Sequence, residues 1–397
     1  PATVGRAFTV ACSDRPGPVV VSLPEDVLRA TTTVVSGPGV EIVERAPSDS
    51  DVASVGAVLA DAERPALLVG GGGWTDAGRS DLRSFAERND LPVVVTFRRH
   101  DLFDNTDDRY AGEAGVAMPA VVRQTLAEAD VVVVLNARFG QMATHAYTLF
   151  GAGPLSLPTG QTIVHVHASE AEFGKVVDAD LTVHAGPNRM AAALAEVEVE
   201  DHARWTRWCA DRRAAFLDTL DCPPQLGDLD MGDVVAWLRE NLPDDVIVTT
   251  GAGNFSAWAD KFLLYGERAR LLASQNGTMG YGLPAAVAAK LVEPDRTVVC
   301  FAGDGDLQMN LQELGTGLQE DARPIVLVVD NGSYGTIRMH QELHHPGRVV
   351  GTDIVNPDFV AIAGAYGMHA EQVLATADFG PAFERALASS TGALLHL

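Results

Sequence analysis

Two short polar motifs in the last third of the sequence combine residue types that could hold a metal ion. Gly-Asp-Gly at 303–305 follows the apolar run 298–302, and Asp-Asn-Gly at 330–332 follows the apolar run 325–329. Such short apolar runs predict buried parallel strands, and open parallel sheets bind ligands at the carboxyl ends of their strands. The 24 residues between the motifs allow one helix and a return strand, so a right-handed crossover would bring the two loops side by side.

The oxygen atoms in these two loops are of the kind that Mg²⁺ prefers. Asp304 offers a carboxylate, Asn331 a side-chain carbonyl and Ser333 a backbone carbonyl, and phosphate oxygens and water would complete an octahedron. The flanking glycines would let backbone N–H groups approach a diphosphate. Each tripeptide alone could be an ordinary turn, but the presence of both at strand ends favours a site for a metal ion and a diphosphate.

In these motifs the sequence resembles the thiamine diphosphate-dependent enzymes, specifically the acetolactate synthase and pyruvate decarboxylase-like superfamily. The resemblance covers the whole chain and implies that Asp304, Asn331 and the Ser333 carbonyl are the Mg²⁺ ligands. Two positions depart from the family pattern: Asp306 replaces a small hydroxyl residue, which leaves its backbone N–H for the diphosphate, and Asp330 replaces the first of two asparagines. The cofactor-binding residues that the resemblance implies are Asn254, Gly277, Thr278, Met279, Gly303, Asp304, Gly305, Asp306, Asn331, Ser333, Tyr334 and Gly335.

A second match to the family is the loop 276–284, NGTMGYGLP. By the resemblance, Met279 is a catalytic residue that props the thiazolium ring against the aminopyrimidine and enforces the bent cofactor, while Gly277 and Thr278 line the site. The alternative for Met279 is a flexible core filler. The loop 251–254, Gly-Ala-Gly-Asn, would bring Asn254 to the cofactor or is an ordinary strand-to-helix turn.

The elements that must position these residues alternate along most of the chain. We expect strands at 19–23, 66–69, 92–96, 131–135, 162–166, 246–249, 298–302 and 325–329, separated by amphipathic helices. This alternation predicts an α/β protein with two doubly wound parallel sheets.

The resemblance assigns a domain to each part of the chain. Residues 1–30 would be the C-terminal remnant of a pyrimidine-binding domain, 51–198 a central Rossmann-like domain and 229–397 the diphosphate-binding domain. Composition indicates linkers at 31–50, which is rich in Thr, Ser, Gly and Pro, and at 199–228, which contains Cys-Pro-Pro. Because Pro1 opens in what reads as mid-helix, we expect the sequence to be part of a longer chain.

Composition excludes several classes of protein. The chain has 53 acidic and 29 basic residues among 397, a formal net charge of −24, which disfavours nucleic acid and anionic membranes as partners. The four cysteines form no CxxC pair, so we expect neither a zinc ribbon nor a disulfide scaffold, and a cytoplasmic location. No apolar run reaches the roughly 18 residues that a membrane helix needs, and no signal peptide is evident.

The activity that the resemblance implies is decarboxylation of a 2-oxo acid followed by carboligation, with thiamine diphosphate and Mg²⁺, in a homodimer or homotetramer. The alternatives are a 2-oxo acid decarboxylase, a glyoxylate carboligase, an acyl-CoA lyase or a non-catalytic cofactor-binding paralogue. In the family a glutamate of the pyrimidine-binding domain activates the cofactor, and we expect it before Pro1, so this sequence alone should be inactive.

Other polar motifs give weaker signals. FAD is not expected, because the segment 137–140, ARFG, does not continue into the acidic pattern of flavin-binding relatives, and the glycine run 70–73 is interpreted as a structural loop. His340, His344 and His345 could suggest zinc, but no third ligand outside this run is evident. His165 and His167 alternate with valines, which indicates one half-buried strand face.

Overall fold

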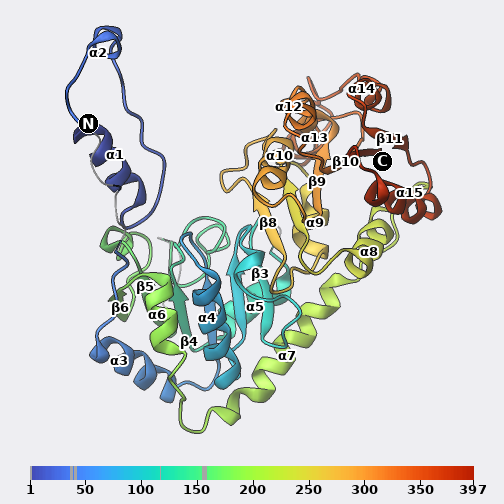
Figure 1. Ribbon diagram of the computed structural model, residues 1–397. Helices are drawn as coiled ribbons and strands as arrows, with labels where there is room; N and C mark the ends of the chain where they lie inside the picture. Colours follow the sequence, from blue (N-terminus) through green and yellow to red (C-terminus); the bar gives the residue numbers. More distant parts are fainter. Residues whose placement is uncertain (1, 36–38, 40–42, 117, 154–158) are drawn as a thin grey trace. The chain divides into compact units, whose positions relative to one another are not determined.

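The computed structural model describes residues 2–35, 39, 43–116, 118–153 and 159–397 and divides the chain into two compact units (Figure 1). The first unit comprises residues 1–96 and 120–213, and the second comprises 97–119 and 214–397. From the sequence we expected one boundary between these two domains, in the linker 199–228. The structure differs from this expectation because the segment 97–119 also packs with the second unit.

The first unit is built on parallel strands in the order β2-β1-β4-β5-β6. Every residue of the central strands β1 and β4 is buried, as expected for a sheet that helices cover on both faces. The strands are β1 (Pro65–Val69), β2 (Val93–Thr96), β4 (Val131–Leu135), β5 (Thr162–His167) and β6 (Leu181–His184). The helices are α3 (Asp49–Ala60), α4 (Asp76–Arg88), α5 (Ala120–Glu128), α6 (Pro187–Leu194) and most of α7 (Thr206–Leu217), with 3₁₀ turns η2 (Glu170–Glu172) and η3 (His202–Trp205).

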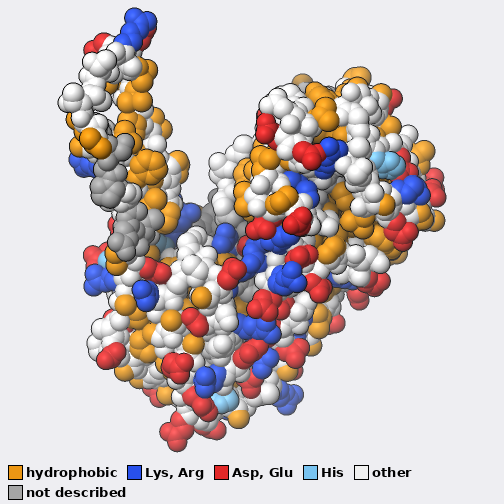
Figure 2. Space-filling view, in the orientation of Figure 1, with side chains coloured by type: hydrophobic (Ala, Val, Ile, Leu, Met, Phe, Trp, Pro, Cys, Tyr) orange, Lys and Arg blue, Asp and Glu red, His pale blue; other side chains and the backbone are white. Residues whose placement is uncertain are grey.

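Residues 2–35 form two short helices, α1 (Ala2–Cys12) and α2 (Glu25–Arg29), neither of which has a buried residue. The strand expected at 19–23 does not form in the structure. No other strand pairs with these residues in the described chain, and an unpaired strand would gain no ladder hydrogen bonds. Apolar side chains therefore stay exposed along this segment, as Figure 2 shows, and Val20 is 93% exposed.

The second unit contains a parallel sheet in the order β11-β12-β10-β9-β7-β8. Its strands are β7 (Ile247–Thr250), β8 (Arg270–Ala273), β9 (Val298–Gly303), β10 (Ile325–Val329), β11 (His369–Gln372) and β12 (Ala393–His396). Its helices are α8 (Met231–Asn241), α9 (Ser256–Phe262), α10 (Gly282–Val292), α11 (Asp304–Leu307), α12 (Glu313–Gln319), α13 (Gly335–His344), α14 (Phe359–Ala365) and α15 (Thr376–Ala388), with η4 (Asp218–Leu220) before them. The segment 97–119 adds η1 (His100–Leu102) and β3 (Tyr110–Ala114). The predicted α/β class with two parallel sheets is confirmed.

The strand order places a topological switch between β7 and β9. From β7 the chain moves to β8 on one side, whereas β9 and then β10 lie on the other side. Loops that leave two such strands diverge and open a crevice at their carboxyl ends. The pairing of Gly303 on β9 with Val329 on β10 also puts the loops after these strands next to each other, which confirms the juxtaposition expected from the sequence.

Alternating side chains of the central strands fill a core on each face of this sheet. Phe301 packs in the cluster with α8, α9 and α15, whereas its neighbours Cys300 and Ala302 pack in the cluster with α10, α12 and α14. Successive side chains of a strand point to opposite faces of the sheet. This alternation determines which side chains at the strand ends remain to form a site. Among the described residues, no helix has both the length and the apolar composition needed to span a membrane.

We predict that Phe383→Ala destabilises the second unit by about 3–5 kcal/mol, because this fully buried ring would leave a cavity beside Phe379 and Trp237. Leu387→Ala on the same helix, where the side chain is 40% exposed, is the control and should cost less than about 1 kcal/mol. Denaturant unfolding followed by circular dichroism measures both, and equal losses would contradict the assignment of this core.

Candidate functional site

A cavity of about 550 Å³ lies at the carboxyl ends of β7, β9 and β10. Thr278, one of the twelve residues expected to bind the cofactor, is not in its wall, and the Thr278 hydroxyl instead donates to Asn276 Oδ1 at 2.6 Å. The other eleven line the cavity: Asn254, Gly277, Met279, Gly303, Asp304, Gly305, Asp306, Asn331, Ser333, Tyr334 and Gly335.

The candidate metal ligands come from the loops after β9 and β10. Asp304 is only 3% exposed, and its Oδ2 accepts a hydrogen bond from Asn356 Nδ2 at 2.7 Å. Burial raises the pKa of Asp304, and the negative charge of Asp330 adds to the effect, while the Asn356 hydrogen bond opposes it. A divalent cation would relieve this unfavourable concentration of negative charge.

The contacts of Asp330 turn it away from the cavity and leave Asn331 as the member of the pair that faces it. Asp330 Oδ1 accepts hydrogen bonds from the Gly332 N–H and from Asn356 Nδ2, at 2.8 and 2.7 Å, and its Oδ2 lies 2.9 Å from His396 Nε2. Asp330 is therefore held against β12, whereas Asn331 lines the cavity.

The oxygens of the candidate set suit a hard cation. Asn331 Oδ1 accepts from the Ser333 N–H at 3.1 Å, and the Ser333 carbonyl accepts from the Gly335 N–H at 2.8 Å. Each of these oxygens retains a second lone pair, so the residues present fit Mg²⁺. The described residues contain no group of three or more His, Cys, Asp or Glu suited to a metal.

Aromatic rings pack against the glycines of the first motif. A Cβ on Gly303 would lie 2.6 Å from the Phe255 ring, and one on Gly305 would lie 2.7 Å from the Tyr334 ring. The rings therefore leave no room for a side chain at either position, although both glycines line the cavity. Gly277 does face open space, and its φ of +72° is the reason for glycine there.

Asp306 joins three loops through its side chain, a role that the sequence analysis missed. Its Oδ1 accepts from the Ala252 N–H at 3.1 Å and from the Gly280 N–H at 2.9 Å. Burial raises its pKa, and these two hydrogen bonds oppose that rise. The sequence did contain a signal for this role, since Asp306 replaces the family's small hydroxyl residue. A carboxylate reaches further than a hydroxyl group and can accept hydrogen bonds from two loops at once.

A reciprocal pair of hydrogen bonds fixes Asn254. Its N–H donates to Thr336 Oγ1, and the Thr336 hydroxyl donates to Asn254 Oδ1, both at 2.8 Å. The loop after β7 is thereby attached to the first turn of α13, and both residues line the cavity.

Arg98 is not in the cavity wall but binds the backbone of two strand ends next to it, and sequence reasoning also missed this residue. This residue is 3% exposed, and its guanidinium donates to the backbone carbonyls of Ser274 and Gly251, each at 2.7 Å. Its Nε lies 3.4 Å from Asp260 Oδ2. Burial raises the pKa of Asp260 to about 6, against the lowering effect of the Arg98 charge. Arg98 therefore fixes the ends of β7 and β8 from a segment more than 150 residues earlier.

The other polar motifs form no metal site in the described residues. His340 and His344 stack on α13 with ring centroids 5.8 Å apart. His165 and His167 are more deeply buried than expected, at 1% and 2% exposure, and burial lowers the pKa of His167 to about 4.

The first two glycines of the run after β1 pack against protein atoms. Asn136 Nδ2 donates to the Gly72 carbonyl at 2.9 Å, and a Cβ on Gly71 would lie 2.2 Å from the Asn136 carbonyl oxygen. Trp74 Nε1 donates to the Gly70 carbonyl at 2.8 Å. These contacts give Gly70 and Gly71 a packing role, whereas Gly72 and Gly73 line a cavity of about 570 Å³.

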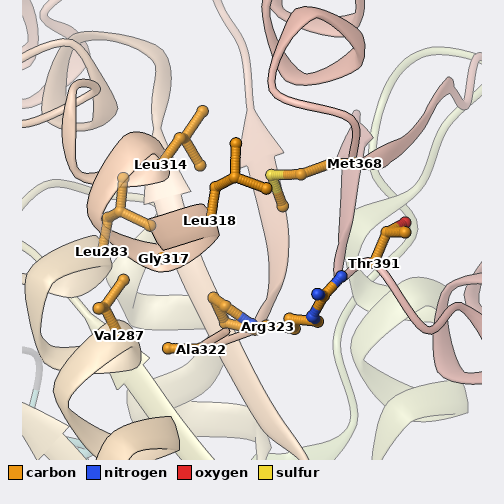
Figure 3. Close-up of a pocket in the computed structure, with 10 residues that line it drawn as sticks. Leu283, Val287, Leu314, Gly317, Leu318, Ala322, Arg323, Met368 and Thr391 are labelled. Atoms are coloured by element: carbon orange, nitrogen blue, oxygen red, sulfur yellow. The ribbon is translucent and has the colours of Figure 1, made fainter. Parts of the chain in front are cut away.

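A separate cavity in the second unit is too small to bind a cofactor. It holds about 10 Å³, roughly the space of one water molecule. Leucine, valine and methionine side chains surround it, and Figure 3 shows Leu283, Leu314 and Met368 turned towards one another. This cavity is a packing defect between α10, α12 and the C-terminal strands.

Both units match models of known protein domains. Residues 52–194 match the model of the thiamine pyrophosphate enzyme central domain, and residues 251–397 match that of the C-terminal TPP binding domain. The second match contains the whole cavity wall described above.

Curated relatives are acetolactate synthases. The large subunit from Parasynechococcus marenigrum is 33% identical over 383 residues, which are 92% of this chain and 60% of that protein. The isozyme 1 and isozyme 2 large subunits from Escherichia coli are 30% and 29% identical over the whole of this chain, and the alignments cover 70% and 71% of those proteins. The chain thus spans about 60 to 70% of the length of these relatives. With its central and TPP-binding domains in place, the chain belongs to the thiamine pyrophosphate enzyme family.

Proposed function

We propose that this chain is part of an acetolactate synthase-like enzyme that decarboxylates a 2-oxo acid and joins the product to a second carbonyl compound, with thiamine diphosphate and Mg²⁺. The observation that carries the proposal is one cavity at the switch point of the second sheet, where all but one of the twelve expected residues line the wall. The similarity to acetolactate synthases supports the choice of reaction.

Each residue has a specific part in this proposal. Asp304, Asn331 and the Ser333 carbonyl would hold Mg²⁺, since they supply hard oxygens beside one another. The half-buried Met279 offers an apolar surface on the cavity wall, on which the bent cofactor would rest. When bound, thiamine diphosphate supplies the electron sink for the carbanion left by decarboxylation. Asp306 and Arg98 would act as positioning residues that keep the loops in register.

The oligomeric state, the location and the cofactor content of the enzyme are also part of the proposal. We expect a homodimer or homotetramer, a cytoplasmic location and no FAD.

Asp304→Ala should weaken Mg²⁺-dependent binding of thiamine diphosphate by more than about 100-fold. Loss of a direct ligand should cost more than the 10- to 100-fold typical of residues behind the ligands. Calorimetric titration with and without Mg²⁺ measures the effect. Glu320→Ala, which removes an exposed carboxylate from the same crossover, is the control and should bind as wild type does. Unchanged affinity in Asp304→Ala, or wild-type binding independent of a divalent metal, would refute the metal site.

Asp306→Ala should both destabilise the second unit and weaken cofactor binding. It would leave the buried N–H groups of Ala252 and Gly280 without an acceptor, at a cost of about 1–3 kcal/mol each. Asp306→Asn keeps an oxygen acceptor and should restore most of both properties. Thermal unfolding and cofactor titration of the two variants test this role, and an asparagine variant as defective as the alanine one would argue that the charge itself matters.

Turnover distinguishes the proposed enzyme from a non-catalytic paralogue. The protein supplied with thiamine diphosphate, Mg²⁺ and pyruvate should release CO₂ and form an acetoin or acetolactate product. Binding of the cofactor without CO₂ release from pyruvate or other 2-oxo acids would leave a cofactor-binding protein and reject the enzymatic proposal.

A further inference from the structure

A second cavity of about 540 Å³ adjoins the proposed cofactor site within the second unit. The two cavities share wall residues, among them Ala252, Asn254, Gly277 and Thr336. A molecule in the second cavity could therefore reach the first. A volume of this size suits an organic ligand considerably larger than a three-carbon oxo acid.

The wall of the second cavity is mainly apolar and aromatic. Phe97, Tyr110 and Phe216 come from the segment 97–119 and the end of α7, and Leu263 and Met339 come from the α9 and α13 side. Such a wall gains free energy by burying an apolar group.

One carboxyl group in this wall has capacity for a ligand. Glu113 Oε1 accepts a hydrogen bond from the Arg98 backbone N–H at 3.0 Å, and no other hydrogen bond of this carboxyl occurs among the described residues. Gly115 leaves room for the carboxyl, because a Cβ there would lie 2.2 Å from Glu113 Oε1 and 2.4 Å from Oε2. Burial, together with the charge of Asp260, raises the pKa of Glu113 to about 8. At neutral pH this group is therefore an O–H donor.

A histidine in the same wall packs against the Tyr265 ring but lacks hydrogen bonds at its nitrogens. His100 is 2% exposed, and neither ring nitrogen has a hydrogen bond within the described part of the chain. Burial lowers its pKa to about 4, so the neutral imidazole offers one donor and one acceptor. Buried polar atoms without partners are uncommon in folded proteins, and a ligand would satisfy them.

The Arg98 guanidinium in this wall has no hydrogen-bonding capacity left for a ligand. The Arg98 guanidinium is engaged with Ser274, Gly251 and Ser256 as well as Asp260. Arg98 thus builds the wall rather than binding a ligand.

We propose that this second cavity binds a substrate carbonyl compound with a large apolar or aromatic substituent, whose carbonyl oxygen accepts a hydrogen bond from the Glu113 carboxyl. The substrate class is an aryl or branched-chain aldehyde, which carries no charge, and its apolar part lies against Phe97, Tyr110 and Phe216. The inference that this ligand is a substrate rests on the proposed function, whereas the inference that the ligand binds in this cavity does not.

Binding can be tested with unreactive ketones in the protein with and without thiamine diphosphate and Mg²⁺. Acetophenone should bind at least about tenfold more tightly than acetone, because the phenyl group fills the apolar cavity. Val116→Trp should abolish this preference, since Val116 lines the cavity and is 66% exposed, so the larger side chain can be accommodated at its edge. Val292→Trp, at a 77% exposed position on α10, is the control and should bind as wild type does.

The pH dependence tests the role of Glu113. Acetophenone carries no charge, so a change in its affinity reports groups of the protein. The charged or titratable groups that line the cavity with Glu113 are Arg98, His100, Tyr110, Asp260, Lys261 and His340. Because only the protonated carboxyl donates, affinity should fall as the pH rises through about 8 in wild type. Glu113→Gln keeps a donor that does not titrate, so its affinity should stay constant over this range.

The outcomes separate this proposal from the proposed function. Unchanged acetophenone binding in Val116→Trp, equal loss in Val292→Trp, or a wild-type affinity independent of pH around 8 would overturn the inference. With cofactor and pyruvate present, Val116→Trp should lower kcat/KM for benzaldehyde as the acceptor at least about tenfold more than for acetaldehyde. If pyruvate is turned over with neither aldehyde while acetophenone binds as expected, the catalytic proposal fails and the binding site stands.

Discussion

The site depends on one buried carboxylate, that of Asp306, at the point where three loops meet. Taking an ionised carboxyl group out of water costs several kcal/mol unless hydrogen bonds compensate. The backbone N–H groups of Ala252 and Gly280 provide that compensation, and they can do so only if the loops after β7 and before α10 keep their positions. The energetic requirement of one side chain thus fixes the backbone of the cavity before any ligand binds.

Arg98 applies the same principle on the opposite side of the β7 loop. Its guanidinium satisfies the Gly251 and Ser274 carbonyls, and Asp260 supplies a counter-charge. A buried guanidinium that lost these acceptors would be strongly unfavourable, so the segment 97–119 must stay packed on the second unit. That requirement explains why a segment which precedes α5 in sequence belongs structurally to the unit formed by residues 214–397.

The sequence was sufficient for features that depend on local pattern. Runs such as Val298–Gly303 and Ile325–Val329 are short, apolar and followed by polar turns, and these properties predicted both the strands and the position of Asp304 and Asn331 at their carboxyl ends. Contacts between distant residues were not predictable in this way. The links of Arg98 to Gly251 and of Asn356 to Asp304 depend on the three-dimensional path of the chain, and the unpaired run 19–23 shows that apolar composition alone does not make a strand.

The two adjoining cavities differ in the state of their acidic groups, and this difference indicates what each can bind. The first contains Asp304 with Asp330 behind it, both close to the Asn356 amide, in a chain of net charge −24. An anionic diphosphate would be repelled there unless a divalent cation came with it, so metal dependence follows from electrostatics. In the second cavity burial keeps Glu113 protonated at neutral pH, and the wall is largely apolar. An uncharged carbonyl group next to an apolar substituent meets no such repulsion, so a charged cofactor and a neutral carbonyl group would each enter the cavity that its own charge favours.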